Sequence, residues 1–191
     1  YFGMSLPDEK VWEQLTIANA AADHHAVVEI LKEIYKAKWV NTGISKGGQT
    51  TMYHRYFYPE DVDISVPYVA PLNFSEEDKR VYHFLDTVGD PECRNRVRGF
   101  QTEMLRNKAT YLPTFEKLAK QENLTYSMGM EKAYELTVLE YAFAFFQWGI
   151  IDCGSIPKKG KPSLMVDHLD RVSGISWISN EGIANLQPFF Y

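Results

Sequence analysis

The sequence has few cysteines and no long apolar run, and both absences restrict the class of protein. Its 2 cysteines, Cys93 and Cys153, are too few for a disulfide scaffold and too widely spaced for a zinc knuckle. They fit one disulfide bridge in an oxidising compartment or two buried thiols in a reducing one. The most apolar window, 136–151, is interrupted by Glu140 and Gln147, so it falls short of the roughly 18 apolar residues of a membrane span.

The sequence also lacks an excess of positive charge. Lys and Arg number 20 against 25 Asp and Glu, which gives a formal net charge of -5. Because nucleic-acid-binding domains carry clustered basic residues, we expect no nucleic-acid partner. A hydrophobic fraction of 45% over 191 residues is typical of a globular protein with one full core.

The ends of the sequence have neither an initiator Met nor a polar tail. It begins with Tyr1-Phe2-Gly3 and ends on the aromatic run 187–191. Natural termini are usually polar and loosely held. We therefore expect this sequence to be an internal piece of a longer protein.

The strongest functional signal is a glycine-rich stretch around Ser45. Residues 43–47 form a G-x-S-x-G pentapeptide, and Gly48 follows it. An expected strand, 39–42, precedes the pentapeptide and an expected helix, 49–58, follows it. In that context the pentapeptide is typical of a nucleophile elbow. The alternative is a glycine-rich turn without catalytic function, because Gly and Ser are common residues.

The glycines of this stretch have a steric explanation. Ser45 must occupy a strained turn that lifts its hydroxyl off the sheet, and we expect side chains at Gly43 or Gly47 to collide with a neighbouring strand or helix. The helix after Ser45 would direct N–H groups and a partial positive charge toward a developing oxyanion.

The expected elements alternate between helix and strand in the first part of the sequence. The end of a strand is expected at 1–5, a helix capped by Thr16 at 17–36, and a second strand at 62–70. Strand, helix and strand in this order indicate a parallel sheet in an α/β fold.

The rest of the sequence shows mainly helical periodicity. It extends from 75 to 149, with Pro91 expected to begin one helix and Pro113 expected in the first turn of another. Further helices are expected at 163–172 and 181–190.

Taken together, these motifs resemble those of a known family. The segments on which the resemblance depends are YFGMSLP at 1–7, GISKGGQT at 43–50, YFYP at 56–59, VD at 62–63 and VPYVAPL at 66–72. They are similar to the bacterial secreted serine aminopeptidases of tripeptidyl and prolyl type, which are distant relatives of the Pro-X carboxypeptidases.

The resemblance implies a fold and an activity. The family consists of α/β-hydrolases, which implies a core segment with the nucleophile elbow over 1–74, an inserted all-helical cap over 75–156 and a helical return segment over 157–191. It implies a serine exopeptidase that hydrolyses peptides through an acyl-enzyme at Ser45, with the Lys46 N–H as one oxyanion donor. No cofactor is implied.

The resemblance also implies a catalytic triad that this sequence does not complete. In this fold the order is Ser, acid, His, and in the family both partners follow the cap. His168 with Asp167 or Asp170 has the right order, but all three lie on one short helical stretch. We expect the piece alone to be inactive, and His54 and His83 to be surface or cap residues.

We predict no metal site. His24 and His25 are adjacent, and adjacent residues on a helix point about 100° apart, so they cannot chelate one metal together. Their expected role is a partly exposed helix face.

Further expectations depend on the resemblance. A secreted or periplasmic location is implied, and this favours a Cys93–Cys153 bridge over free thiols. The implied substrate is a peptide, whose α-amine could bind Glu131, Glu135 or Glu140; the alternative is that these are ordinary solvated carboxylates.

Two other functions are compatible with the sequence. One is an esterase or lipase of the α/β-hydrolase fold that uses the same elbow. The other is a non-catalytic core-plus-cap fragment that associates through exposed sheet edges.

Overall fold

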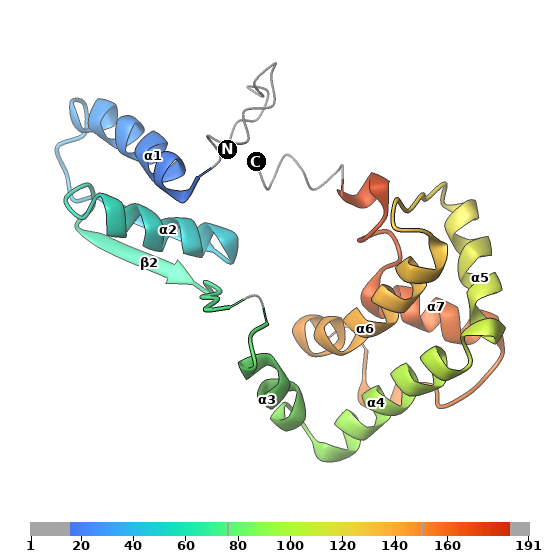
Figure 1. The fold of residues 1–191 in the computed structure, drawn as a ribbon. Helices are drawn as coiled ribbons and strands as arrows, with labels where there is room; N and C mark the ends of the chain where they lie inside the picture. The colour runs from blue at the N-terminus through green and yellow to red at the C-terminus, as the bar shows by residue number, and fades with distance from the viewer. Residues whose placement is uncertain (1–15, 76, 150, 184–191) are drawn as a thin grey trace. The chain divides into compact units, whose positions relative to one another are not determined.

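The chain folds as two compact units whose boundary lies between residues 78 and 79 (Figure 1). The computed structural model describes residues 16–75, 77–149 and 151–183. The strand end expected at 1–5 and most of the helix expected at 181–190 lie outside the described residues.

The first unit contains a parallel pair of strands joined by a helix. Its elements are α1 (Ile17–Lys32), β1 (Val40–Ile44), α2 (Lys46–Phe57) and β2 (Ile64–Tyr68). The strands are parallel, with Val40 paired to Ile64 and Ile44 paired to Tyr68. The predicted strand–helix–strand order is confirmed, and it is consistent with an α/β domain.

The helices of this unit cover one side of the sheet. α2 packs against both strands, and α1 packs against α2 (Figure 1). As predicted, Thr16 caps α1, because its side chain accepts a hydrogen bond from the Asn19 N–H at 3.1 Å. α1 ends at Lys32, one turn earlier than expected.

Four apolar side chains of the sheet are exposed. Val40, Ile44, Ile64 and Tyr68 are 52%, 69%, 54% and 56% exposed. These four residues, called the apolar sheet face below, form two cross-strand pairs.

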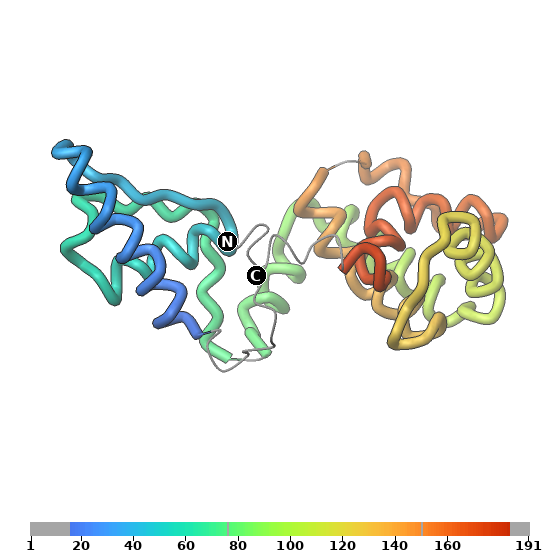
Figure 2. The backbone as a smooth tube through the Cα atoms, turned by 90° about the horizontal axis from the view of Figure 1, so that it is seen from above, coloured from blue at the N-terminus to red at the C-terminus, as the bar shows by residue number. Residues whose placement is uncertain are grey.

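All regular elements in the described residues of the second unit are helices. Its elements are α3 (Arg80–Thr87), α4 (Pro91–Arg106), α5 (Lys108–Gln121), α6 (Met130–Trp148), the short 3₁₀ helix η2 (Cys153–Ser155) and α7 (Pro162–Ser173). Figures 1 and 2 show α6 (orange) beside α7 (orange-red). The predicted helical block is confirmed, and α7 shares one core with the helices before it.

Aromatic side chains form much of the core of this unit. Phe100, Tyr111, Phe115, Tyr134 and Tyr141 are each at most 1% exposed. Buried hydroxyl groups require partners, and the Tyr134 hydroxyl donates to the Met104 carbonyl at 2.9 Å. Burial, followed by hydrogen bonding to Glu103, raises the pKa of Tyr111 to about 12.

Pro91 and Pro113 occupy different positions in their helices. Pro91 begins α4 as predicted, and Asp90 caps that helix by accepting from the Glu92 N–H at 2.8 Å. The placement of Pro113 in a first turn is wrong, because α5 begins at Lys108 and contains Pro113 in its interior. Interior proline costs about 3 kcal/mol, and here the burial of Tyr111 and Phe115 on the same helix offsets that cost.

A disulfide bond joins Cys93 in α4 to Cys153 in η2, with 5.6 Å between their Cα atoms. It connects the first turn of α4 to the segment that follows α6, so it closes a loop containing three helices of the unit.

Candidate active site

Ser45 occupies the junction between β1 and α2. Its backbone has φ 56° and ψ -118°, and its side chain is exposed. A residue other than glycine in such a region costs on the order of 1–3 kcal/mol, so it persists only where the surroundings impose it.

Both backbone groups of Ser45 are hydrogen-bonded. Its N–H donates to the Tyr68 carbonyl of β2 at 3.0 Å, and its carbonyl accepts from the Gln49 N–H of α2 at 3.1 Å. The last residue pair of the sheet and the first turn of the helix therefore impose the strained backbone.

A second strained residue lies at the same edge of the sheet. Val69 has φ 42° and directly follows β2, as Ser45 directly follows β1. Ile44 and Tyr68 are paired across the two strands, and each is followed directly by one of the strained residues. Strain of this kind clusters at functional sites, and ligands bind at the carboxyl ends of parallel strands.

The glycines around Ser45 do not all have the role that the sequence predicts. A Cβ at Gly43 would lie 2.3 Å from the Gly47 carbonyl oxygen, and one at Gly48 would lie 2.8 Å from the Tyr68 carbonyl oxygen. The expected collision at Gly43 is therefore present. The collision expected at Gly47 is wrong, because a Cβ added to Gly47 would meet no atom within 4 Å. The backbone of Gly47 is instead what a Cβ at Gly43 would strike.

The first turn of α2 presents backbone N–H groups beside Ser45. Lys46 is the first residue of α2, and the N–H groups of a helix's first turn point toward its N-terminal end. Thr50 and Thr51 stabilise this turn by donating to the Lys46 and Gly47 carbonyls at 3.1 and 2.9 Å. Partial burial lowers the pKa of the Lys46 ammonium group.

No hydrogen bond joins the Ser45 hydroxyl to a histidine within the described ranges. His54 lies nine residues further along α2, about 14 Å away along the axis. It is 4% exposed, so the expectation of a surface residue is wrong. The reason is Asp61, whose carboxylate Oδ2 lies 2.8 Å from His54 Nε2. His83 is exposed, as expected.

His168 is a core residue of the second unit. Its Nε2 lies 2.7 Å from the Tyr141 hydroxyl. The nearby Asp170 accepts the Ile175 N–H at 2.9 Å and so ends α7. Burial, and then the charge of Arg171, lowers the pKa of His168.

The acidic residues considered for α-amine binding differ in their surroundings. Lys108 forms ion pairs with both Glu131 and Glu135, the latter at 2.6 Å. Glu140 is exposed on α6.

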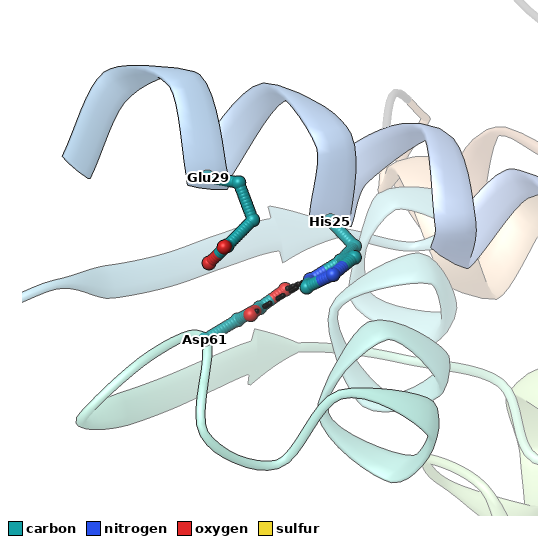
Figure 3. A group of neighbouring side chains, drawn as sticks. All are labelled: His25, Glu29 and Asp61. Atoms are coloured by element: carbon teal, nitrogen blue, oxygen red, sulfur yellow. Dashed lines mark hydrogen bonds and ion pairs between the residues drawn. The ribbon is translucent and has the colours of Figure 1, made fainter. Parts of the chain in front are cut away.

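The sequence did not reveal a cluster in which His25, His54 and Asp61 meet. His25 Nδ1 lies 2.9 Å from each Asp61 oxygen (Figure 3). The sequence carried no signal for this cluster, because its members come from α1, α2 and the α2–β2 loop.

Among the helices that the structure describes, none has the length and apolar character needed to cross a membrane.

Comparison with known proteins connects the whole chain to peptidases. Residues 1–191 match the model of the family described as PS-10 peptidase S37. The chain is also 34% identical over 196 residues to the prolyl tri/tetrapeptidyl aminopeptidase of Streptomyces mobaraensis. That alignment covers 100% of this chain but 41% of the relative, so the chain spans less than half the length of that protein. No solved structure gives a significant match.

Proposed function

The chain belongs to the PS-10 peptidase S37 family, and on that premise we propose that it carries the nucleophile of a serine exopeptidase. Ser45 is the nucleophile, and the substrate is a peptide from which an amino-terminal tripeptide or tetrapeptide is released. The name of the Streptomyces relative supports this substrate class.

The observation that carries the proposal is the backbone of Ser45. An exposed serine with φ 56°, held between a strand and a helix, supports the interpretation of this turn as a nucleophile elbow. A turn with no function beyond connecting two elements would gain stability from glycine at this position, because glycine adopts positive φ without strain.

The proposed mechanism proceeds through an acyl-enzyme. Ser45 Oγ attacks the scissile carbonyl while a histidine takes its proton, and the leaving amine receives that proton as the peptide bond breaks. Water then hydrolyses the ester at Ser45. The Lys46 N–H and a second donor hold the oxyanion, and each such donor contributes roughly 3 kcal/mol of transition-state stabilisation.

We propose that the histidine and its acid belong to the part of the longer protein that this chain does not span. The alignment leaves more than half of the Streptomyces relative uncovered, which is ample room for both. On this proposal the 191-residue chain is inactive by itself.

The helical unit is proposed to be a cap that admits only peptide ends to Ser45. Helical insertions commonly close active sites in this way. Glu140 is the proposed contact for the substrate α-amine, because Glu131 and Glu135 both hold Lys108. The Cys93–Cys153 bond supports an oxidising compartment, and hence secretion.

The proposal is tested with a fluorophosphonate probe, with adducts located by peptide mass spectrometry. We expect Ser45 to be labelled in the longer protein and not in its Ser45→Ala variant, and the 191-residue chain to remain unlabelled. Labelling of the short chain at Ser45 would show that it contains its own base. Failure to label the longer protein would overturn the serine peptidase mechanism.

Association is a second candidate function, favoured by the apolar sheet face. Exposed apolar surface of this kind marks contact sites. Sedimentation of the 191-residue chain at low concentration tests this association. Dimers that dissociate when Ile44 is replaced by Lys would support it, and a stable monomer would exclude it.

A further inference from the structure

A buried carboxylate connects α1 to the loop that leads into β2. Asp61 lies in the α2–β2 loop and is 4% exposed. Figure 3 shows His25 and Glu29 extending from α1 toward it. One donor atom from each of these three residues lies within 4.8 Å of the others.

His54 approaches the same carboxylate from α2, with its Nε2 2.8 Å from Asp61 Oδ2. Asn41 Nδ2 donates to the Thr51 carbonyl at 3.3 Å, and the same amide nitrogen lies 3.1 Å from His54 Nδ1. These contacts orient the His54 ring toward Asp61.

Asp61 is thus hydrogen-bonded to imidazole rings from both α1 and α2. A buried carboxylate is costly unless it is hydrogen-bonded and paired with a cation. On its other side the carboxylate faces His25 and a second carboxylate, Glu29. Two carboxylates that converge on one position repel each other unless a proton or a metal ion lies between them.

We propose that His25, Glu29 and Asp61 bind a divalent transition-metal ion of the Zn²⁺ class. One imidazole nitrogen and two carboxylate oxygens suit Zn²⁺, whereas Ca²⁺ and Mg²⁺ prefer oxygen ligands alone. Ligands at about 2.1 Å from a tetrahedral Zn²⁺ lie about 3.4 Å apart. The observed separations of 2.9 Å for His25 and Asp61, and at most 4.8 Å within the group, lie on either side of that value.

The surroundings of the three ligands support a built site. His25 and Glu29 are four residues apart on α1, so they lie on one helix face. His54 holds Asp61 through Oδ2, which leaves Oδ1 for the metal, and Asn41 fixes the His54 ring in turn. Carboxylate ligands held by such partners are typical of metal sites. Glu29 is exposed, so the fourth coordination position is open to water.

Binding would replace the proton on His25 Nδ1 by the metal ion and release that proton. The ion would then fasten α1 to the α2–β2 loop. The site lies at the end of α2 remote from Ser45, and it does not depend on the function proposed for that serine.

The test is calorimetric titration of Zn²⁺ into the 191-residue chain after treatment with a chelator, near neutral pH. We expect one Zn²⁺ per chain, and Co²⁺ in its place should give the visible absorption of a tetrahedral site. Glu29→Gln is expected to weaken binding at least tenfold, and since Glu29 is exposed this variant should fold.

The matched control is Glu33→Gln, one turn further along the chain. The Glu33 side chain is 84% exposed and pairs with Lys36 at 3.8 Å, so its loss should leave Zn²⁺ affinity unchanged. His54→Gln should weaken binding about 10- to 100-fold, as loss of a ligand's hydrogen-bond partner does. Absence of stoichiometric binding, or equal affinity in the parent chain and Glu29→Gln, would overturn the proposal.

Discussion

The Tyr141 hydroxyl and His168 Nε2 lie 2.7 Å apart in the core of the helical unit. The first residue is on α6 and the second on α7, so this hydrogen bond joins two helices separated by the η2 segment. His168 is 7% exposed and packs against the ring of Phe100. Burial disfavours the charged form of this imidazole and lowers its pKa, so protonation of His168 in acid opposes the folded state of the helical unit.

We predict that the free energy of unfolding decreases as the pH falls below about 6.5. Burial, and secondarily Arg171, lowers the pKa of folded His168 below its ordinary 6.5. The unfolded chain therefore binds this proton first, so the stability contribution is complete above 6.5 and is lost as the pH falls toward the folded pKa. Urea denaturation at a series of pH values measures this. Below pH 6.5, His168→Gln should reduce the dependence of the free energy of unfolding on pH. His83→Gln, at an exposed position, should not change it.

At the helix boundaries, some positions follow from local sequence and others do not. Thr16, Pro91 and the strand–turn–helix around Ser45 were predictable, because capping, proline at a first turn and glycine-rich turns depend on a few neighbouring residues. Pro113 was misplaced because the burial of its neighbours Tyr111 and Phe115 outweighs its local preference. That burial depends on helices distant in the sequence.

The candidate sites show the same division. Ser45 and Gly43 follow from a five-residue pattern. The burial of His54 could not be predicted, because it depends on Asp61 in a loop and on His25, which is 36 residues from Asp61 in the sequence. Gly47 was misjudged because the direction of its Cβ depends on where the helix axis points after the turn.

The three glycines of the elbow should differ in their tolerance of alanine. Gly43→Ala and Gly48→Ala place a Cβ within 3.0 Å of backbone or Ala70 atoms, so both should lower the free energy of unfolding by more than about 2 kcal/mol, as overpacking does. The Cβ of Gly47→Ala would meet no neighbouring atom. Because alanine favours the helix over glycine, this variant should raise the free energy of unfolding by about 0.5–1 kcal/mol. Urea denaturation of the three variants provides the measurement. Equal destabilisation by all three would contradict the steric account.

Ser45→Gly should stabilise the chain. The backbone strain at Ser45 costs on the order of 1–3 kcal/mol, and glycine removes it while adding some flexibility to the unfolded state. We expect a net gain of about 1 kcal/mol relative to Ser45→Ala, since alanine removes the hydroxyl but keeps the strain. The measurement is the difference between the two variants in denaturant unfolding. If alanine and glycine give the same stability, the position is not strained.

Reduction of the Cys93–Cys153 bond should destabilise the helical unit. The bond closes a loop of 60 residues, and such a cross-link typically contributes about 2–4 kcal/mol by restricting the unfolded chain. Thermal unfolding with and without a thiol reductant should therefore give two different midpoints. The double variant Cys93→Ser, Cys153→Ser should unfold at the lower midpoint and be insensitive to the reductant, which separates the bond from general effects of the reagent. Because α7 packs against α5 and α6, the loss should spread from the loop into the shared core. Alkylation of both cysteines in the folded chain without reductant would show that the bond does not form.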